Sequence, residues 1–346
     1  MEIGVDSFVA TALDQSKDGS VGDVARVQEL LEQIALADQV GLDVFGIGEH
    51  HRSDYVASAP AVLLAAAAAR TKRIKLASAV TVLSSDDPVR VFQQFATLDL
   101  ISQGRAEIIV GRGSFIESYP LFGYDLDDYD ELAAEKLDLL LTLRTQTKVT
   151  WSGKHRAPLT GQGVYPRPAQ AVLPVYIGVG GTPQSVVRAA MLGLPLIVAI
   201  IGGQPSAFRP LVDLYRDTWK KAGHPAEKCF VGIHNIGFLA DTTEQALETF
   251  WPAYRDAFGK IGRERGWPAP TRPQFDAQCS HLGALAVGDA EAVAEKIIRE
   301  SESLGGISRI TILLDNRMLT HAQLMRAIEL LGTEVAPLVR RAVAGV

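Results

Sequence analysis

The sequence is poor in cysteine and lacks any long apolar run. Only Cys229 and Cys279 occur among its 346 residues, far apart and outside a Cys-x-x-Cys spacing. We therefore expect no disulfide framework and predict a protein of a reducing, cytoplasmic compartment. The longest strongly apolar stretches, at 59–69 and 193–201, are too short for helices that cross a bilayer. The chain also begins without the cationic and apolar segments of a signal peptide, so we expect no membrane association.

Basic residues are not concentrated anywhere in the chain. The net charge is −6, and no basic stretch alternates with aromatic residues, which argues against nucleic acid as a partner. Hydrophobic residues make up 47% of the sequence, enough for one large core or two ordinary ones. Neither of the two irregular stretches described below has the apolar periodicity of a second core. We therefore predict a single domain over residues 1–346.

Three common catalytic motifs are missing. Without Gly-x-Ser-x-Gly the chain has no nucleophile elbow, and without His-Glu-x-x-His or a similar spacing we expect no bound metal. No Gly-x-Gly-x-x-Gly opens a βαβ unit, so we do not expect the chain to bind a nicotinamide cofactor itself. Five further histidines follow no ligand pattern either: His155, His224, His234, His281 and His321.

Eight β-like runs alternate with segments of helical periodicity, and this alternation predicts a parallel sheet. Eight strand and helix pairs over more than 250 residues are typical of a (β/α)8 TIM barrel, with a doubly wound open sheet as the alternative. Two stretches exceed a minimal barrel, at 148–173 and 259–288, and we interpret them as insertions in the βα loops. The eight runs lie at 3–8, 44–48, 74–80, 106–111, 175–179, 194–200, 230–239 and 308–314.

Glu49, His50 and His51 directly follow the second run, at the end of a barrel strand where such proteins keep their chemistry. Imidazole titrates nearest to neutral pH, so this pair is a candidate for proton transfer. Two alternatives stay open. The three side chains could hydrogen-bond their own loop, or they could form the metal centre of a barrel hydrolase.

The fifth run ends in Gly180 and Gly181, followed by Thr182 and a helix start that includes Ser185. Such a turn exposes backbone N–H groups at the positive end of a helix dipole, which suits a phosphate. The alternative is an ordinary turn in which Thr182 caps the helix.

Arg112 stands between two glycines where the fourth run ends, and its guanidinium could bind the same phosphate. The alternative for this arginine is a surface ion pair with Glu117 or Asp125.

In the order and spacing of these motifs, the chain resembles the bacterial luciferase-like flavin monooxygenase family over nearly its whole length. The matching segments are Gly-Leu-Asp at 41–43, Glu-His-His at 49–51, 78–83, 87–90, 98–99, 102–105, Gly-Arg-Gly at 111–113, Tyr-Pro-Arg-Pro at 165–168, 174–177, 180–181, 188–190 and 193–195.

The resemblance implies a barrel that binds FMN at the C-terminal ends of its strands and in which the reduced flavin reacts with O2. His50 matches the family histidine at the reactive edge of the flavin, as proton donor or as the residue that stabilises the oxygenated flavin. The expected cofactor-binding residues are Glu49, Ala79, Val80, Arg112, Gly180, Gly181, Thr182 and Ser185. Ala79 and Val80 match a non-prolyl cis peptide under the flavin ring.

The chain departs from the luciferase catalytic subunit at the phosphate turn. That subunit has an acidic residue where Gly180 stands and one residue fewer, so either Thr182 or Ser185 could be the phosphate ligand.

The resemblance also implies a two-component enzyme, which takes reduced FMN from a separate flavin reductase and acts on a small organic substrate. A mobile cover should keep water from the flavin, and we expect residues 259–288 to provide it. A homodimer through the alanine-rich second helix is expected by family analogy. The alternatives are a deazaflavin-dependent hydride-transfer enzyme of the same fold and a flavin-binding protein without turnover.

Overall fold

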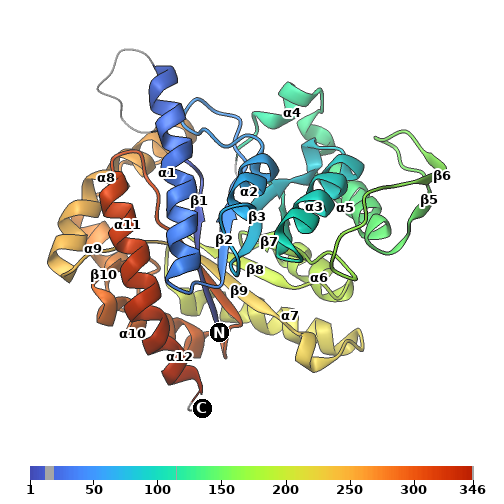
Figure 1. The fold of residues 1–346 in the computed structure, drawn as a ribbon. Helices are drawn as coiled ribbons and strands as arrows, with labels where there is room; N and C mark the ends of the chain where they lie inside the picture. Colours follow the sequence, from blue (N-terminus) through green and yellow to red (C-terminus); the bar gives the residue numbers. More distant parts are fainter. Residues whose placement is uncertain (12–18, 114, 345–346) are drawn as a thin grey trace.

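Eight parallel strands close a barrel in the computed structural model, which describes residues 1–11, 19–113 and 115–344 (Figure 1). The order of hydrogen-bonded neighbours is β9-β11-β1-β2-β3-β4-β7-β8, and the pairing of β8 with β9 closes the ring. The predicted (β/α)8 barrel is confirmed, because a doubly wound sheet would have two open edges. The barrel strands are β1 (Glu2–Ser7), β2 (Val44–Ile47), β3 (Lys75–Val82), β4 (Ala106–Gly111), β7 (Val175–Val179), β8 (Leu196–Ile200), β9 (Val231–Leu239) and β11 (Arg309–Leu313).

Helices surround the barrel, and α1 and α11 lie side by side on its outside (Figure 1). Three helices, α2, α3 and α6, begin with a proline, which suits the first turn because its missing N–H has no partner there. The helices are α1 (Gly19–Gln39), α2 (Pro60–Ala68), α3 (Pro88–Ser102), α4 (Ser118–Phe122), α5 (Tyr129–Thr145), α6 (Pro183–Met191), α7 (Arg209–Lys221), α8 (Thr243–Arg265), α9 (Arg272–Cys279), α10 (Ala290–Ser303), α11 (His321–Leu330) and α12 (Ala336–Ala344). Short helical turns are η1 (Leu83–Ser85), η2 (Leu126–Asp128), η3 (Pro205–Phe208), η4 (Ala226–Lys228) and η5 (Leu331–Val335).

The hydrophobic core has two layers because successive side chains of a strand point to opposite faces. The larger layer lies between the sheet and the helices and contains side chains such as Ile3, Val5 and Phe45. The smaller layer lies inside the barrel and consists of Val44, Ala77, Ile109, Tyr176 and Ile197.

An ionic cluster fills the barrel at the N-terminal ends of the strands. The fully buried Arg309 guanidinium lies 2.7 Å from a Glu107 carboxylate oxygen and donates to Glu2 over 2.7 Å. Lys75 Nζ lies 2.5 Å from Glu2 and 3.4 Å from Glu107. Lys75 therefore belongs to this cluster.

Both insertions contain regular structure. Residues 148–173 include the antiparallel hairpin of β5 (Lys148–Trp151) and β6 (Leu159–Gly163). The range 259–288 begins inside α8, which continues to Arg265, and also contains α9 and β10 (Ala286–Gly288), a short strand paired with β9. The second insertion is thus a helical extension, and its expected start at Gly259 was wrong.

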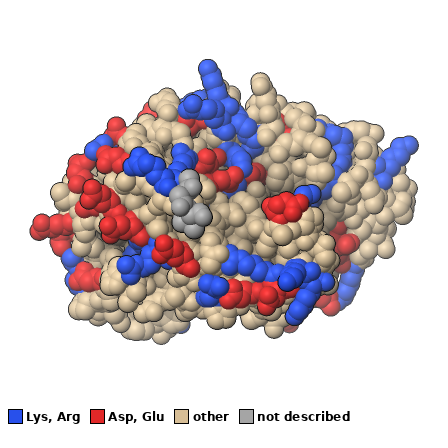
Figure 2. Space-filling view, turned by 90° about the horizontal axis from the view of Figure 1, so that it is seen from below, with Lys and Arg blue, Asp and Glu red and all other residues tan. Residues whose placement is uncertain are grey.

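The face on which both termini lie carries charges of both signs. Lysine and arginine side chains alternate there with aspartate and glutamate, and acidic residues gather toward the left of the view (Figure 2). Among the described residues, no helix is both long enough and apolar enough to cross a membrane.

Candidate active site

A cavity of about 570 Å³ opens where the barrel strands end, and it brings together most of the residues that the sequence assigned to a site. Gly181 is the exception, since only its neighbour Gly180 lines the cavity. Gly181 has a φ of +123°, a conformation that favours glycine in this turn. The lining residues from the sequence-based assignment are Glu49, His50, Ala79, Val80, Arg112, Gly180, Thr182 and Ser185.

Glu49 fixes the loop after β2. One carboxylate oxygen lies 2.9 Å from His51 Nε2, and the other accepts a hydrogen bond from the Val82 backbone N–H over 2.9 Å. His51 turns its ring edge to Phe122, whereas His50 points into the cavity. The expected local hydrogen bonding therefore holds for Glu49 and His51 but leaves His50 free. His50 does not join the Glu49–His51 pair, and among the described residues the three do not form a group with metal-ligand spacing.

His50 lies in an aromatic cage. Its ring stacks on Tyr55 at 4.2 Å between centroids, lies 4.5 Å from Phe8 and meets the edge of Phe115 at 5.6 Å. Burial, followed by the positive charges of His51 and Arg52, lowers the pKa of His50 from 6.5 to about 3. The imidazole is therefore uncharged at neutral pH. Its Nδ1 atom is buried without a hydrogen-bond partner among the described residues.

The peptide bond between Ala79 and Val80 is cis, as the resemblance implied. At this point the pairing of β3 with β4 shifts register, between Ala79 and Thr81. Gly111 on β4 lies against Val80, because an added Cβ would come within 2.6 Å of the valine side chain. The sequence of β4 thus leaves room for the irregular backbone of β3 under the cavity.

Arg112 and the start of α6 also line the cavity. The Arg112 guanidinium pairs with Asp130 and lies 4.8 Å from the centre of the Tyr129 ring. The alternative of an ion pair with a nearby acid is thus borne out, but the acid is Asp130, whereas Glu117 binds Arg52 at 2.8 Å. Asp130 lies on α5, and nothing in the local sequence indicated that this helix lies beside Arg112.

The Thr182 hydroxyl does not cap the helix, although Thr182 stands at the N-cap position of α6. In the first turn, Pro183 has no N–H, and the N–H groups of Ser185 and Val186 donate to the Thr182 carbonyl oxygen over 3.1 and 3.3 Å. A Cβ added at Gly180 or Gly181 would meet no heavy atom within 4 Å. This part of the cavity thus combines a guanidinium, a helix N-terminus and open room, a donor set that suits a phosphate.

The second half of α8 covers the cavity. Arg52 binds Glu264 at 2.5 Å, Lys260 binds Asp54, and Arg317 binds Asp256 at 2.6 Å. The lining residues from this segment are Tyr254, Asp256, Ala257, Phe258, Lys260, Ile261, Arg265 and Trp267. Only the beginning of the range 259–288 therefore reaches the cavity, while α9 packs against α8.

The sequence-based analysis missed three polar side chains inside the barrel. Asp6 on β1, His234 on β9 and Thr311 on β11 are 2%, 9% and 3% exposed. Asp6 Oδ2 lies 2.6 Å from His234 Nδ1 and accepts a hydrogen bond from the Thr311 hydroxyl. The available signal was the presence of polar residues within strands that are otherwise largely apolar.

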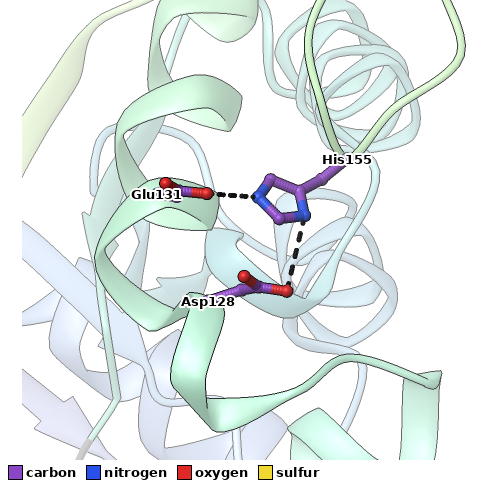
Figure 3. Close-up of side chains that lie close together, drawn as sticks. All are labelled: Asp128, Glu131 and His155. Atoms are coloured by element: carbon purple, nitrogen blue, oxygen red, sulfur yellow. Dashed lines mark hydrogen bonds and ion pairs between the residues drawn. The ribbon is translucent and has the colours of Figure 1, made fainter.

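A second cluster of ionisable side chains lies away from the cavity, where the loop between β5 and β6 meets the start of α5. His155 stands between Glu131, 3.0 Å from Nε2, and Asp128, 3.7 Å from Nδ1 (Figure 3). Of the described residues, only these three form a group with metal-ligand spacing. Lys154 already pairs with Glu131 at 2.6 Å, and each ring nitrogen faces a different carboxylate. Ion pairing that holds the hairpin to α5 explains this arrangement.

Comparisons with known proteins agree with the geometry. The profile of a family described as luciferase-like monooxygenase matches residues 1–306. A 4-hydroxyprotoasukamycin monooxygenase of Streptomyces nodosus subsp. asukaensis is 27% identical over 89% of this chain and 85% of its own length. An N-acetyl-S-alkylcysteine monooxygenase of Bacillus subtilis is 30% identical over 84% of this chain and 87% of its own.

Solved structures share the fold. A monooxygenase from Streptomyces bottropensis superposes with a TM-score of 0.85 at 22% identity, covering 97% of this chain and 99% of its own. The oxygenating component of the 3,6-diketocamphane monooxygenase of Pseudomonas putida, in complex with FMN, gives 0.76 at 20% identity, covering 97% and 98%. An F420-dependent secondary alcohol dehydrogenase gives 0.71 at 21% identity, covering 98% and 99%. With the profile match over most of its length, the chain belongs to the luciferase-like monooxygenase family, a family of enzymes.

Proposed function

We propose that the chain is an FMN-dependent monooxygenase, which takes reduced flavin from a separate reductase and transfers one atom of O2 to a small organic substrate. One observation carries the proposal. A single cavity is lined by a guanidinium and a helix start, at Arg112 and α6, and by the neutral His50 with its aromatic cage. This combination suits a cofactor with a phosphate tail and a flat ring system.

Arg112 and the residues at the start of α6 fit the FMN phosphate. Arg112 would exchange Asp130, whose side chain is 81% exposed, for the phosphate. The Thr182 and Ser185 hydroxyls, both at the cavity wall, would donate to the remaining phosphate oxygens. A helix N-terminus adds a favourable electrostatic contribution.

The residues around His50 fit the ring system. When bound, reduced FMN would supply the electrons that activate O2. His50 is neutral, so it would act by hydrogen bonding and would not supply a charge. The cis peptide at Ala79 and Val80 lies in the wall of the same cavity.

The covering segment supports a reaction that requires exclusion of water. The ion pairs of Arg52, Asp54 and Asp256 hold the second half of α8 over the cavity. The aromatic side chains beneath it favour an apolar substrate. We propose that opening of this segment, not of the whole range 259–288, admits the substrate.

A deazaflavin-dependent hydride transfer is the second candidate function. Its support is the structural likeness to the F420-dependent secondary alcohol dehydrogenase, at a TM-score of 0.71. Both cofactors carry a flat ring system and a phosphate, so the same cavity residues would serve either one.

We also propose a homodimer in the cytoplasm. Val62 on α2 and Leu100 and Ile101 on α3 are 67%, 48% and 46% exposed, and these two helices pack together. Both cysteines are free. The reductase would be a separate protein, since the sequence has no nicotinamide fingerprint.

Cofactor titration tests the function. The purified chain should quench FMN fluorescence on binding, and stopped-flow mixing with oxygen should show bound reduced FMN reoxidising at a rate different from that of free reduced FMN. Binding of F420 with no binding of FMN would favour the second candidate. Binding of neither cofactor would refute both.

A further inference from the structure

The pair of Asp6 and His234 lies in the same cavity as His50 but differs from it chemically. Both residues line the cavity, and they come from strands β1 and β9, on either side of β11. His234 Nδ1 lies 2.6 Å from Asp6 Oδ2, and the Thr311 hydroxyl donates to the same oxygen. The other Asp6 oxygen, Oδ1, is buried without a hydrogen-bond partner among the described residues.

This geometry determines which ring nitrogen of His234 is free. An ionised carboxylate can only accept hydrogen bonds, so Nδ1 carries the hydrogen in the bond to Asp6. Nε2 then holds the lone pair. It has no partner among the described residues, and the ring lines the cavity. An imidazole with its Nδ1–H held by a carboxylate and its Nε2 free is oriented to accept a proton.

His50 is not suited to that task. Aromatic rings surround it, no carboxylate of the described residues is hydrogen-bonded to it, and its pKa is lowered to about 3. A base whose conjugate acid has so low a pKa accepts a proton poorly at neutral pH. His234 stacks on Phe8 at 6.0 Å between near-parallel rings and comes from β9, whereas His50 follows β2.

We propose that His234, oriented by Asp6, is the base that removes a proton from an acidic O–H group of the substrate, and that the substrate is a phenol or an enol. The inference rests on the proposed function. His234 Nε2 takes the proton, the O–H electron pair stays on the substrate oxygen, and Asp6 remains ionised beside the imidazolium. The substrate carbon conjugated to that oxygen becomes more electron-rich, a C–O bond forms there to one atom of O2, and the C–H bond at that carbon breaks, its hydrogen leaving as a proton that restores the substrate O–H. Reduced flavin would supply two electrons and two protons, and the second oxygen atom leaves as water after taking up one proton from the solvent. The proton then leaves Nε2 for the solvent.

The surroundings favour this class of substrate. Phe8, Tyr55, Phe115 and Trp267 line the cavity and suit a flat molecule. Burial of the Asp6 carboxylate costs free energy. A substrate with an acidic proton gives the Asp6–His234 pair a function that accounts for this cost.

The test uses para-nitrophenol as a probe, because its phenolate absorbs visible light and its phenol does not. At fixed pH, binding to the wild-type chain should increase the ionised fraction of the probe. The acid dissociation constant of bound para-nitrophenol should be at least about tenfold higher than that of the free probe. H234Q should abolish the increase and D6N should reduce it. The control H224Q changes a histidine that is hydrogen-bonded to the Met191 carbonyl, outside the cavity, and should behave as wild type.

A second measurement needs no variant and no probe. Nitrogen NMR of the wild-type chain should show neutral His234 with its hydrogen on Nδ1. A hydrogen on Nε2 would overturn the proposal, as would probe ionisation that persists in H234Q or depends on His50. These outcomes are independent of FMN binding. A chain that binds FMN but fails these tests keeps the proposed function and loses only the base.

Discussion

Arg112 offers the sharpest test of the proposed phosphate site, because two substitutions should change FMN affinity in opposite directions. A charge-assisted hydrogen bond to phosphate contributes about 1.5–3 kcal/mol. R112A should therefore weaken FMN binding about 10- to 150-fold, since 1.4 kcal/mol corresponds to a factor of about ten.

D130N should have the opposite effect, since Asp130 competes with the phosphate for Arg112. The Asp130 side chain is 81% exposed and that of Arg112 is 32% exposed. Such surface pairs contribute about 0–1 kcal/mol, so FMN affinity should rise by no more than about fivefold.

Fluorescence titration of each variant with FMN measures both effects. D127N is the matched control, because the exposed Asp127 carries the same charge and its side chain makes no contact with Arg112. Both effects should shrink at high salt. Unchanged FMN affinity in R112A would mean that the phosphate is bound elsewhere. An equal rise in FMN affinity in D127N and D130N would mean that Asp130 acts only through the net charge of the protein.

Four further outcomes are expected. H50Q should lower turnover and leave FMN affinity nearly unchanged. An equal loss of turnover and of FMN affinity would mean that His50 binds the cofactor and does not act in the reaction. H50Q should also flatten the pH dependence of the unfolding free energy between pH 6.5 and about 3. In this window the unfolded wild-type chain binds one proton more, so wild-type stability falls as the pH falls, by up to ~1.4 kcal/mol per pH unit. R309M should destabilise the fold by about 3–5 kcal/mol in urea unfolding, because the buried Glu107 loses its closest ion-pair partner and keeps only Lys75, 3.4 Å away, as a cation, and a loss below ~1 kcal/mol would contradict this. L100E should convert the proposed dimer to a monomer in sedimentation, and a wild-type monomer would refute the dimer.

The barrel could be predicted from the sequence because each strand is a local signal. All eight apolar runs became strands, and their ends agree with the structure to within two residues at most positions. The glycine turn at Gly180 and the histidine at His50 are also local, because each directly follows its strand. A strand end fixes the position of the residues that come after it.

Contacts between distant segments could not be predicted in the same way. Asp6 and His234 are separated by 228 residues, and only closure of the barrel brings them together. The helical character of the second insertion did have a signal. Thr271 and Gln274 form a capping box, and this Thr-x-x-Gln pattern predicts the start of α9 within a segment rich in glycine and proline.

A crystal structure of the chain with FMN would test whether the cavity at the strand ends binds this cofactor, and in which orientation. The phosphate should lie within hydrogen-bond distance of Arg112 and of Thr182 or Ser185, with the ring system over the Ala79–Val80 peptide and beside His50. FMN bound outside this cavity, or within it with the phosphate beside His50, would contradict the account.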